Sequence, residues 1–126
     1  MATLARTIYL ADDNPAFRQG LFLALRARGY AVRTAADGEE VLELLESGRP
    51  DLMLLDVMMP GMNGLEVLAR VRADRRWSDL PVLLLTAAAG AETWRVNGGS
   101  ETLQVLAKPI RLEELLRRIE GCLASG

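Results

Sequence analysis

Polar residues that could do chemistry stand at the ends of four apolar runs in this sequence. Asp12 and Asp13 follow the first run, Asp56 closes a later one, and Thr86 and Lys108 close two more. Three carboxylates repel one another when they are crowded, and Mg²⁺ is a hard cation that suits a site of a few carboxylates and water. A carboxylate nucleophile beside a metal, a lysine and a hydroxyl predicts phosphoryl transfer, with Asp56 becoming an acyl phosphate.

These residues can meet only if the apolar runs are neighbouring strands of one sheet. Five short runs predict strands over residues 7–11, 31–35, 52–56, 82–86 and 102–107. Apolar stripes at helical spacing predict helices through residues 17–25, 41–45, 65–71 and 112–119, and a shorter helix is expected near residues 91–96. This alternation predicts an α/β fold, a parallel sheet with helices on both faces.

In a doubly wound parallel sheet, sites form outside the carboxyl ends of the strands. If the first and third strands are neighbours, Asp12, Asp13 and Asp56 share one pocket. Asp51 precedes the same strand as Asp56, and five residues at about 3.3 Å each place it roughly 16 Å away, at the wrong end. Each residue alone has an ordinary explanation, such as a helix cap before Pro15. Their coincidence at one edge favours a common site.

Composition excludes several other functions. The chain of 126 residues is the size of one domain, and it has no histidine, one cysteine and a net charge of −2. Catalysis by a Ser-His-Asp or Cys-His set and a His-ligated zinc site within the chain are therefore excluded. The charge argues against direct binding to nucleic acid, and from the sequence pattern we expect no membrane span or signal peptide. A lone Cys122 is typical of a reduced compartment, so we expect a cytoplasmic protein.

The motifs together resemble the receiver domains of response regulators in two-component signalling. Residues 50–64, PDLMLLDVMMPGMNG, resemble the family's phosphoacceptor strand and the loop that follows it. The other matching motifs are Asp12-Asp13 (acidic pair), Thr86-Ala87 (hydroxyl and small residue) and Lys108-Pro109 (lysine and cis-proline). The resemblance implies a flavodoxin-like sheet in the order 2-1-3-4-5 and a single receiver domain over residues 1–126, with an ordered core of about residues 6–124.

The resemblance also implies a mechanism. Asp56 would accept a phosphoryl group from the phosphohistidine of a partner kinase or phosphotransfer protein, with no enzymatic activity beyond this self-catalysed transfer and autodephosphorylation. The implied ligands of Mg²⁺ are the side chains of Asp12, Asp13 and Asp56 and the backbone carbonyl of Met58. The implied catalytic residues besides Asp56 are Lys108, Thr86 and Ala87. Further implied partners are an effector domain or protein and a second copy of the chain in a homodimer.

Two positions depart from the family pattern. The family commonly carries an aromatic residue three positions before the lysine, where this chain has Val105. Gly98-Gly99 also comes earlier than the family's glycine turn. Both positions belong to the surface around the fourth helix and fifth strand, which the resemblance identifies as the switching surface. We expect intact chemistry, a shift of Thr86 toward the phosphoryl group, and an atypical change over residues 87–99.

Three alternative functions remain open on the sequence alone. A degenerate receiver would act as a scaffold without phosphorylation. An aspartyl-phosphate phosphohydrolase usually has a second aspartate two residues after its nucleophile, where this chain has Met58. A flavodoxin-like carrier needs a phosphate loop rich in serine, threonine and glycine after the first strand, where this chain has Asp12 and Asp13.

Overall fold

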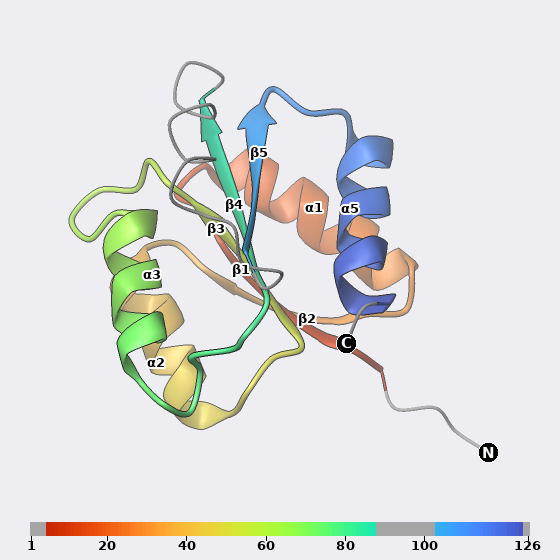
Figure 1. Cartoon of the computed structure of the whole chain (residues 1–126). Helices are drawn as coiled ribbons and strands as arrows, with labels where there is room; N and C mark the ends of the chain where they lie inside the picture. The colour runs from red at the N-terminus through yellow and green to blue at the C-terminus, as the bar shows by residue number, and fades with distance from the viewer. Residues whose placement is uncertain (1–4, 88–102, 125–126) are drawn as a thin grey trace.

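The protein folds as one parallel sheet of five strands with helices on both faces (Figure 1). The structure, a computed structural model, describes residues 5–87 and 103–124. The strands are β1 (Thr7–Ala11), β2 (Ala31–Ala35), β3 (Leu52–Asp56), β4 (Val82–Ala87) and β5 (Leu103–Lys108). The helices are α1 (Pro15–Ala27), α2 (Gly38–Ser47), α3 (Gly64–Ala73) and α5 (Leu112–Ala124). The strand order is β2-β1-β3-β4-β5, which confirms the predicted fold.

Strands β4 and β5 each extend one residue beyond the predicted ends. Their parallel register pairs Thr86 with Ala107 and Ala87 with Lys108, so backbone pairing continues past the apolar runs. The predicted helix at residues 91–96 and the pair Gly98-Gly99 lie outside the described residues. In the part of the chain that the structure describes, no helix is long and apolar enough to cross a membrane.

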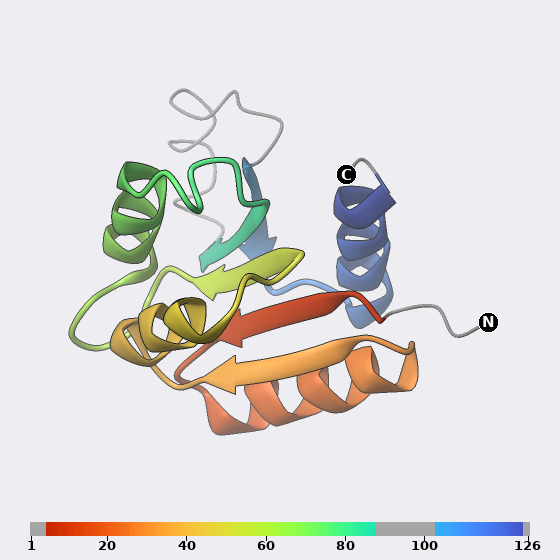
Figure 2. The same cartoon turned by 90° about the horizontal axis from the view of Figure 1, so that it is seen from below.

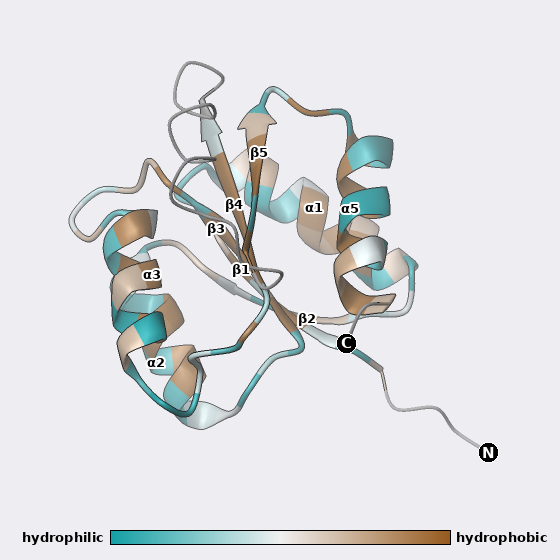
Figure 3. Cartoon of the chain, viewed as in Figure 1, coloured by the Kyte–Doolittle hydropathy of each residue, from teal (hydrophilic) through white to brown (hydrophobic). Residues whose placement is uncertain are grey.

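The two faces of the sheet are buried under different helices (Figure 2). Along β3, Leu52 and Leu54 belong to the core layer formed with α1 and α5. Met53 and Leu55 belong to the layer formed with α2 and α3. A strand covered on both faces is apolar at consecutive positions, and the central strands are accordingly hydrophobic along their length (Figure 3).

Short, capped connections fix the helices that follow β1 and β3. Asn14 is the N-cap of α1, and its side-chain oxygen accepts a hydrogen bond from the backbone N–H of Phe17 at 3.1 Å. Asn63 and Glu66 form a capping box at the start of α3. Asn14 therefore takes the capping role that Asp12 or Asp13 could have filled, which leaves both acids for other contacts.

The start of α3 lies directly against the end of β3. The backbone N–H of Gly64 donates to the carbonyl of Val57 at 3.0 Å. A Cβ atom at Gly64 would lie 2.5 Å from the carbonyl oxygen of Asp56 and 2.9 Å from the Cα of Val57. Only glycine permits this approach of helix to strand, so Gly64 determines where the backbone of Asp56 lies.

We expect Gly64→Ala to lower the free energy of unfolding by about 1–3 kcal/mol, because the new methyl group overlaps backbone atoms that cannot move independently. The matched control is Gly20→Ala in α1, where a Cβ would have no neighbour within 4 Å. That change should stabilise the protein by about 0.5–1 kcal/mol through helix propensity. Urea denaturation measures the free energy of unfolding of both variants. Equal changes in the two variants would contradict the close approach of Gly64 to the backbone of Asp56 and Val57.

Candidate functional site

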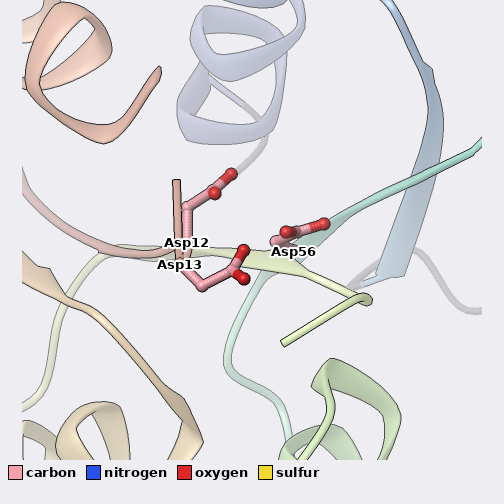
Figure 4. A group of neighbouring side chains, drawn as sticks. All are labelled: Asp12, Asp13 and Asp56. Atoms are coloured by element: carbon pink, nitrogen blue, oxygen red, sulfur yellow. The ribbon is translucent and has the colours of Figure 1, made fainter. Parts of the chain in front are cut away.

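Three carboxylates converge at the carboxyl edge of the sheet (Figure 4). Asp12 and Asp13 follow β1, and Asp56 is the last residue of β3. The register that pairs Ala11 with Leu55 brings the two strand ends level. One carboxylate oxygen from each residue lies within 4.8 Å of the other two. The structure thus brings together the acids that the sequence analysis assigned to one pocket.

Asp12 is the most tightly held of the three. Its side chain is fully buried, Oδ1 accepts a hydrogen bond from the backbone N–H of Asn14 at 2.9 Å, and Oδ2 accepts one from Lys108 Nζ at 3.1 Å. Its backbone carbonyl accepts from Arg18 Nη1 at 2.7 Å, and its backbone N–H donates to the carbonyl of Ala35 at 3.1 Å. Asp13, by contrast, is exposed to solvent.

Lys108 spans the gap between the carboxylates. It is the last residue of β5, and its Nζ lies 3.1 Å from Asp12 Oδ2 and 3.5 Å from Asp56 Oδ1. The Lys108-Pro109 peptide bond is cis, as the resemblance implies. One ammonium therefore faces two buried carboxylates, which leaves net negative charge at this edge of the sheet.

The electrostatics of Asp56 reflect this imbalance. Burial and the nearby Asp12 carboxylate raise the pKa of Asp56 above its ordinary value. The Lys108 ammonium and the backbone N–H of Met58, 3.4 Å from Asp56 Oδ1, act in the opposite direction without cancelling the increase. An additional cation would favour the ionised form of Asp56. The clustered carboxylate oxygens are the hard donors that Mg²⁺ prefers, so the residues present fit this metal.

The carboxylates open into a pocket with a partly apolar wall. Its lining residues are Asp12, Asp13, Asn14, Phe17, Asp56, Met58, Lys108, Pro109 and Ile110. The side chain of Met58 is 70% exposed at the mouth of the pocket. Phe17 and Arg18, in the first turn of α1, also belong to the site, and the sequence pattern did not single them out.

Thr86 and Ala87 end β4, between the strands that carry Asp56 and Lys108. Thr86 is buried and follows Leu85, the residue that pairs with Asp56, while Ala87 pairs with Lys108. Both predicted residues therefore lie at the same edge of the sheet as the acids.

Two other residues named by the sequence analysis have different surroundings. Asp51 lies at the opposite end of β3, where its Oδ2 accepts a hydrogen bond from the backbone N–H of Thr7 at 2.7 Å. Val105 pairs with Leu84 and packs, partly buried, against the core layer under α2 and α3. Thr86 lies two residues after Leu84, so it shares the sheet face of Val105.

Comparison with known proteins places the chain among signalling proteins. The family model described as response regulator receiver domain matches residues 8–120. The response regulator MprA of Mycolicibacterium vanbaalenii is 42% identical over 118 residues, a match that covers 92% of this chain and 49% of the relative. The chain therefore spans about half the length of the curated relatives it matches.

Solved structures agree with the sequence comparisons. The chemotaxis response regulator CheY4 of Vibrio cholerae matches with a TM-score of 0.85 and 32% identity, covering 95% of this chain and all (100%) of that one. The response regulator TrrA of Thermotoga maritima, solved in complex with Mg²⁺-BeF, matches with a TM-score of 0.77 and 33% identity, covering 94% of this chain and 99% of that one.

The raised pKa of Asp56 predicts how stability depends on pH. The folded protein holds this proton more tightly than the unfolded chain does, so the stabilising contribution is complete below the ordinary pKa of 3.8 and is lost as the pH rises through the folded value. Without divalent cations, Asp56→Asn should therefore raise the free energy of unfolding at neutral pH. Urea denaturation in the presence of a chelator measures the difference in free energy of unfolding between Asp56→Asn and the wild type. This difference should disappear below about pH 3 and should become smaller when Mg²⁺ is added. An Asp56→Asn variant that is less stable than the wild type at neutral pH would contradict the raised pKa of Asp56.

Proposed function

The chain is a response-regulator receiver domain, as its resemblance to that family predicted, and from this premise we propose a function for its site. We propose that Asp56 is the phosphoacceptor. The observation that carries the proposal is the ammonium of Lys108, which faces Asp12 at 3.1 Å and Asp56 at 3.5 Å beside a third carboxylate. Phosphoryl transfer needs negative oxygens to approach a carboxylate, and this approach needs concentrated positive charge.

The acidic residues would hold Mg²⁺ through the side chains of Asp12, Asp13 and Asp56, with the backbone carbonyl of Met58 as a further ligand. When bound, the metal supplies positive charge that offsets the repulsion between the carboxylates and the incoming phosphoryl oxygens. The partly buried hydrogen bonds of Asp12 with Asn14 and Lys108 keep its carboxylate oriented before any metal arrives. Exposed Asp13 completes the set from the solvent side.

In the transfer itself, a carboxylate oxygen of Asp56 attacks the phosphorus of a phosphohistidine. The new O–P bond forms as the N–P bond to the donor imidazole breaks, and the electron pair of that bond stays on the imidazole. The donor histidine lies outside these 126 residues, which contain no histidine, and we assign it to a partner kinase or phosphotransfer protein. Lys108 neutralises a phosphoryl oxygen with its compact ammonium, and the Thr86 hydroxyl donates a hydrogen bond to another. Ala87 stands at the position where the resemblance implies a small residue.

The wider role follows from the same premise. We assign the partners to a histidine kinase or phosphotransfer protein upstream and an effector domain or protein downstream, with a second copy of the chain as a further partner. The length of the matched relatives, about twice that of this chain, supports an effector domain in proteins of this kind. We also propose a cytoplasmic location, no direct contact with nucleic acid or membrane, and no enzymatic activity beyond self-catalysed phosphotransfer and autodephosphorylation.

Labelling by radioactive acetyl phosphate tests the phosphoacceptor. The wild-type protein should take up label only with Mg²⁺, and Asp56→Asn should reduce labelling to background because the attacking oxygen is gone. The control is Asp51→Asn, which changes an aspartate at the other end of the same strand and keeps an oxygen that can accept from Thr7. Its labelling should equal that of the wild type. Normal labelling of Asp56→Asn would place the phosphate elsewhere, and an unlabelled wild type would favour the scaffold alternative.

Lys108→Arg tests the need for a compact ammonium. The planar guanidinium keeps the charge but fits poorly between two carboxylates that an ammonium approaches at 3.1 and 3.5 Å. Beryllofluoride is titrated into each protein with Mg²⁺ present, and binding is followed by amide chemical shifts. We expect Lys108→Arg to need about three- to tenfold more beryllofluoride than the wild type for half of the change, as for one impaired charged hydrogen bond. Arg117→Lys, the reverse exchange on the exposed face of α5, should respond as the wild type does. An unchanged response of Lys108→Arg would show that charge alone suffices.

A further inference from the structure

We propose that Phe17 is a positioning residue, whose ring holds the ammonium of Lys108 at the site where Asp56 is phosphorylated; the kinetic part of this inference rests on the proposed function. Lys108 Nζ lies 4.5 Å from the centroid of the Phe17 ring, within the range of a cation–π contact. Both residues line the pocket of the carboxylates. Phe17 is partly buried, and it packs against the core layer under α1 and α5.

The contacts of Phe17 complete a closed circuit of interactions that begins and ends at Asp12. The Asp12 carboxylate accepts from the backbone N–H of Asn14 at 2.9 Å, and the Asn14 side chain accepts from the backbone N–H of Phe17 at 3.1 Å. The aromatic ring of Phe17 faces Lys108, and Lys108 donates back to Asp12 at 3.1 Å. One side chain thus links the first turn of α1 to the end of β5, two elements that are far apart in the sequence.

The ring acts on Lys108 in a way that the carboxylates cannot. The attraction of Asp12 and Asp56 for the ammonium decreases when a divalent cation binds their carboxylates, and phosphorylation replaces the Asp56 carboxylate by a phosphoryl oxygen as the partner of the ammonium. The ring of Phe17 carries no net charge and binds no metal, so its attraction persists through these changes. The ring accepts no conventional hydrogen bond, so an N–H donor of the ammonium that Asp12 does not use stays available for a phosphoryl oxygen. The lysine is therefore kept in place while its partners change.

The composition of the chain makes this contact directly observable. Lys108 is the only lysine, so protein grown on isotope-labelled lysine gives a single set of side-chain NMR signals. Protons above the face of an aromatic ring move upfield, and we expect the Hε signal of Lys108 to lie upfield of its position in the unfolded chain. Phe17→Leu should abolish this shift, and Phe17→Tyr should retain it.

Phe22 supplies the matched control. It is the other phenylalanine of the chain, it lies on the same helix, and its ring faces Arg26, with 5.6 Å between the guanidinium carbon and the ring centroid. Phe22→Leu removes the same number of ring atoms as Phe17→Leu and should leave the Lys108 signal unchanged. A signal that is insensitive to Phe17→Leu, or equally sensitive to both changes, would overturn the contact.

Kinetics test whether the contact serves phosphorylation. The rate of labelling by acetyl phosphate at saturating Mg²⁺ should fall about three- to tenfold in Phe17→Leu, as expected for losing one partly buried cation–π contact. Phe17→Tyr should restore the rate. Replacement of Phe17 by pentafluorophenylalanine keeps the shape of the ring but reverses its quadrupole, so its rate should fall with that of Phe17→Leu. A wild-type rate in the fluorinated variant would assign Phe17 a packing role only and overturn the inference.

The two measurements separate this inference from the proposed function. If the wild-type protein takes up no label, the phosphoacceptor proposal fails, and the kinetic role of Phe17 fails with it. The NMR signal of Lys108 in the unphosphorylated protein still decides whether the ring holds the ammonium. If the wild type is labelled and Phe17→Leu is labelled equally fast, only the inference about Phe17 fails.

Discussion

The site depends on a single constraint: two buried carboxylates share one ammonium. Asp12 is fully buried and Asp56 is 5% exposed, and Lys108 faces both. Buried charges of one sign are costly unless they are paired and hydrogen-bonded. The hydrogen bond from Asn14 and the ion pair with Lys108 serve Asp12, while Asp56 keeps a raised pKa. The unbalanced charge makes this edge of the sheet receptive to a cation.

The fold can impose this arrangement because each charged group ends a different strand of one parallel sheet. Strand β3 lies between β1 and β4, so Asp56 is flanked by the acids that follow β1 and by Thr86. Lys108 comes from the next strand and reaches the carboxylates through its long side chain. The close approach of Gly64 to the carbonyl of Asp56 fixes the strand end from the other side. The register of the parallel strands brings the charged groups level, and the helix caps at Asn14 and Asn63 fix the helices that follow β1 and β3.

Sequence reasoning predicted the strand ends because residue types change abruptly there. Asp56 after a buried apolar run, and Lys108 as the only lysine, are visible without coordinates. The role of Phe17 was not predictable in the same way, since an apolar residue in a helical stripe has the same sequence pattern whether it faces the core or an ammonium. Its ring does both. The last residues of β4 and β5 were missed because the two strands continue to pair through their backbones at Ala87 and Lys108, which the pattern of apolar side chains does not reveal.

Val105 constrains how a signal can leave this site. The resemblance to the family implies an aromatic residue at this position, whose rotamer would accompany a movement of the threonine. Here Val105 and Thr86 share a face of the sheet, and the described residues of β5, LQVLAK, contain no aromatic side chain. A valine has no ring to rotate and has a restricted χ1, so a movement of Thr86 toward a phosphoryl group cannot be coupled to an aromatic rotamer in this strand.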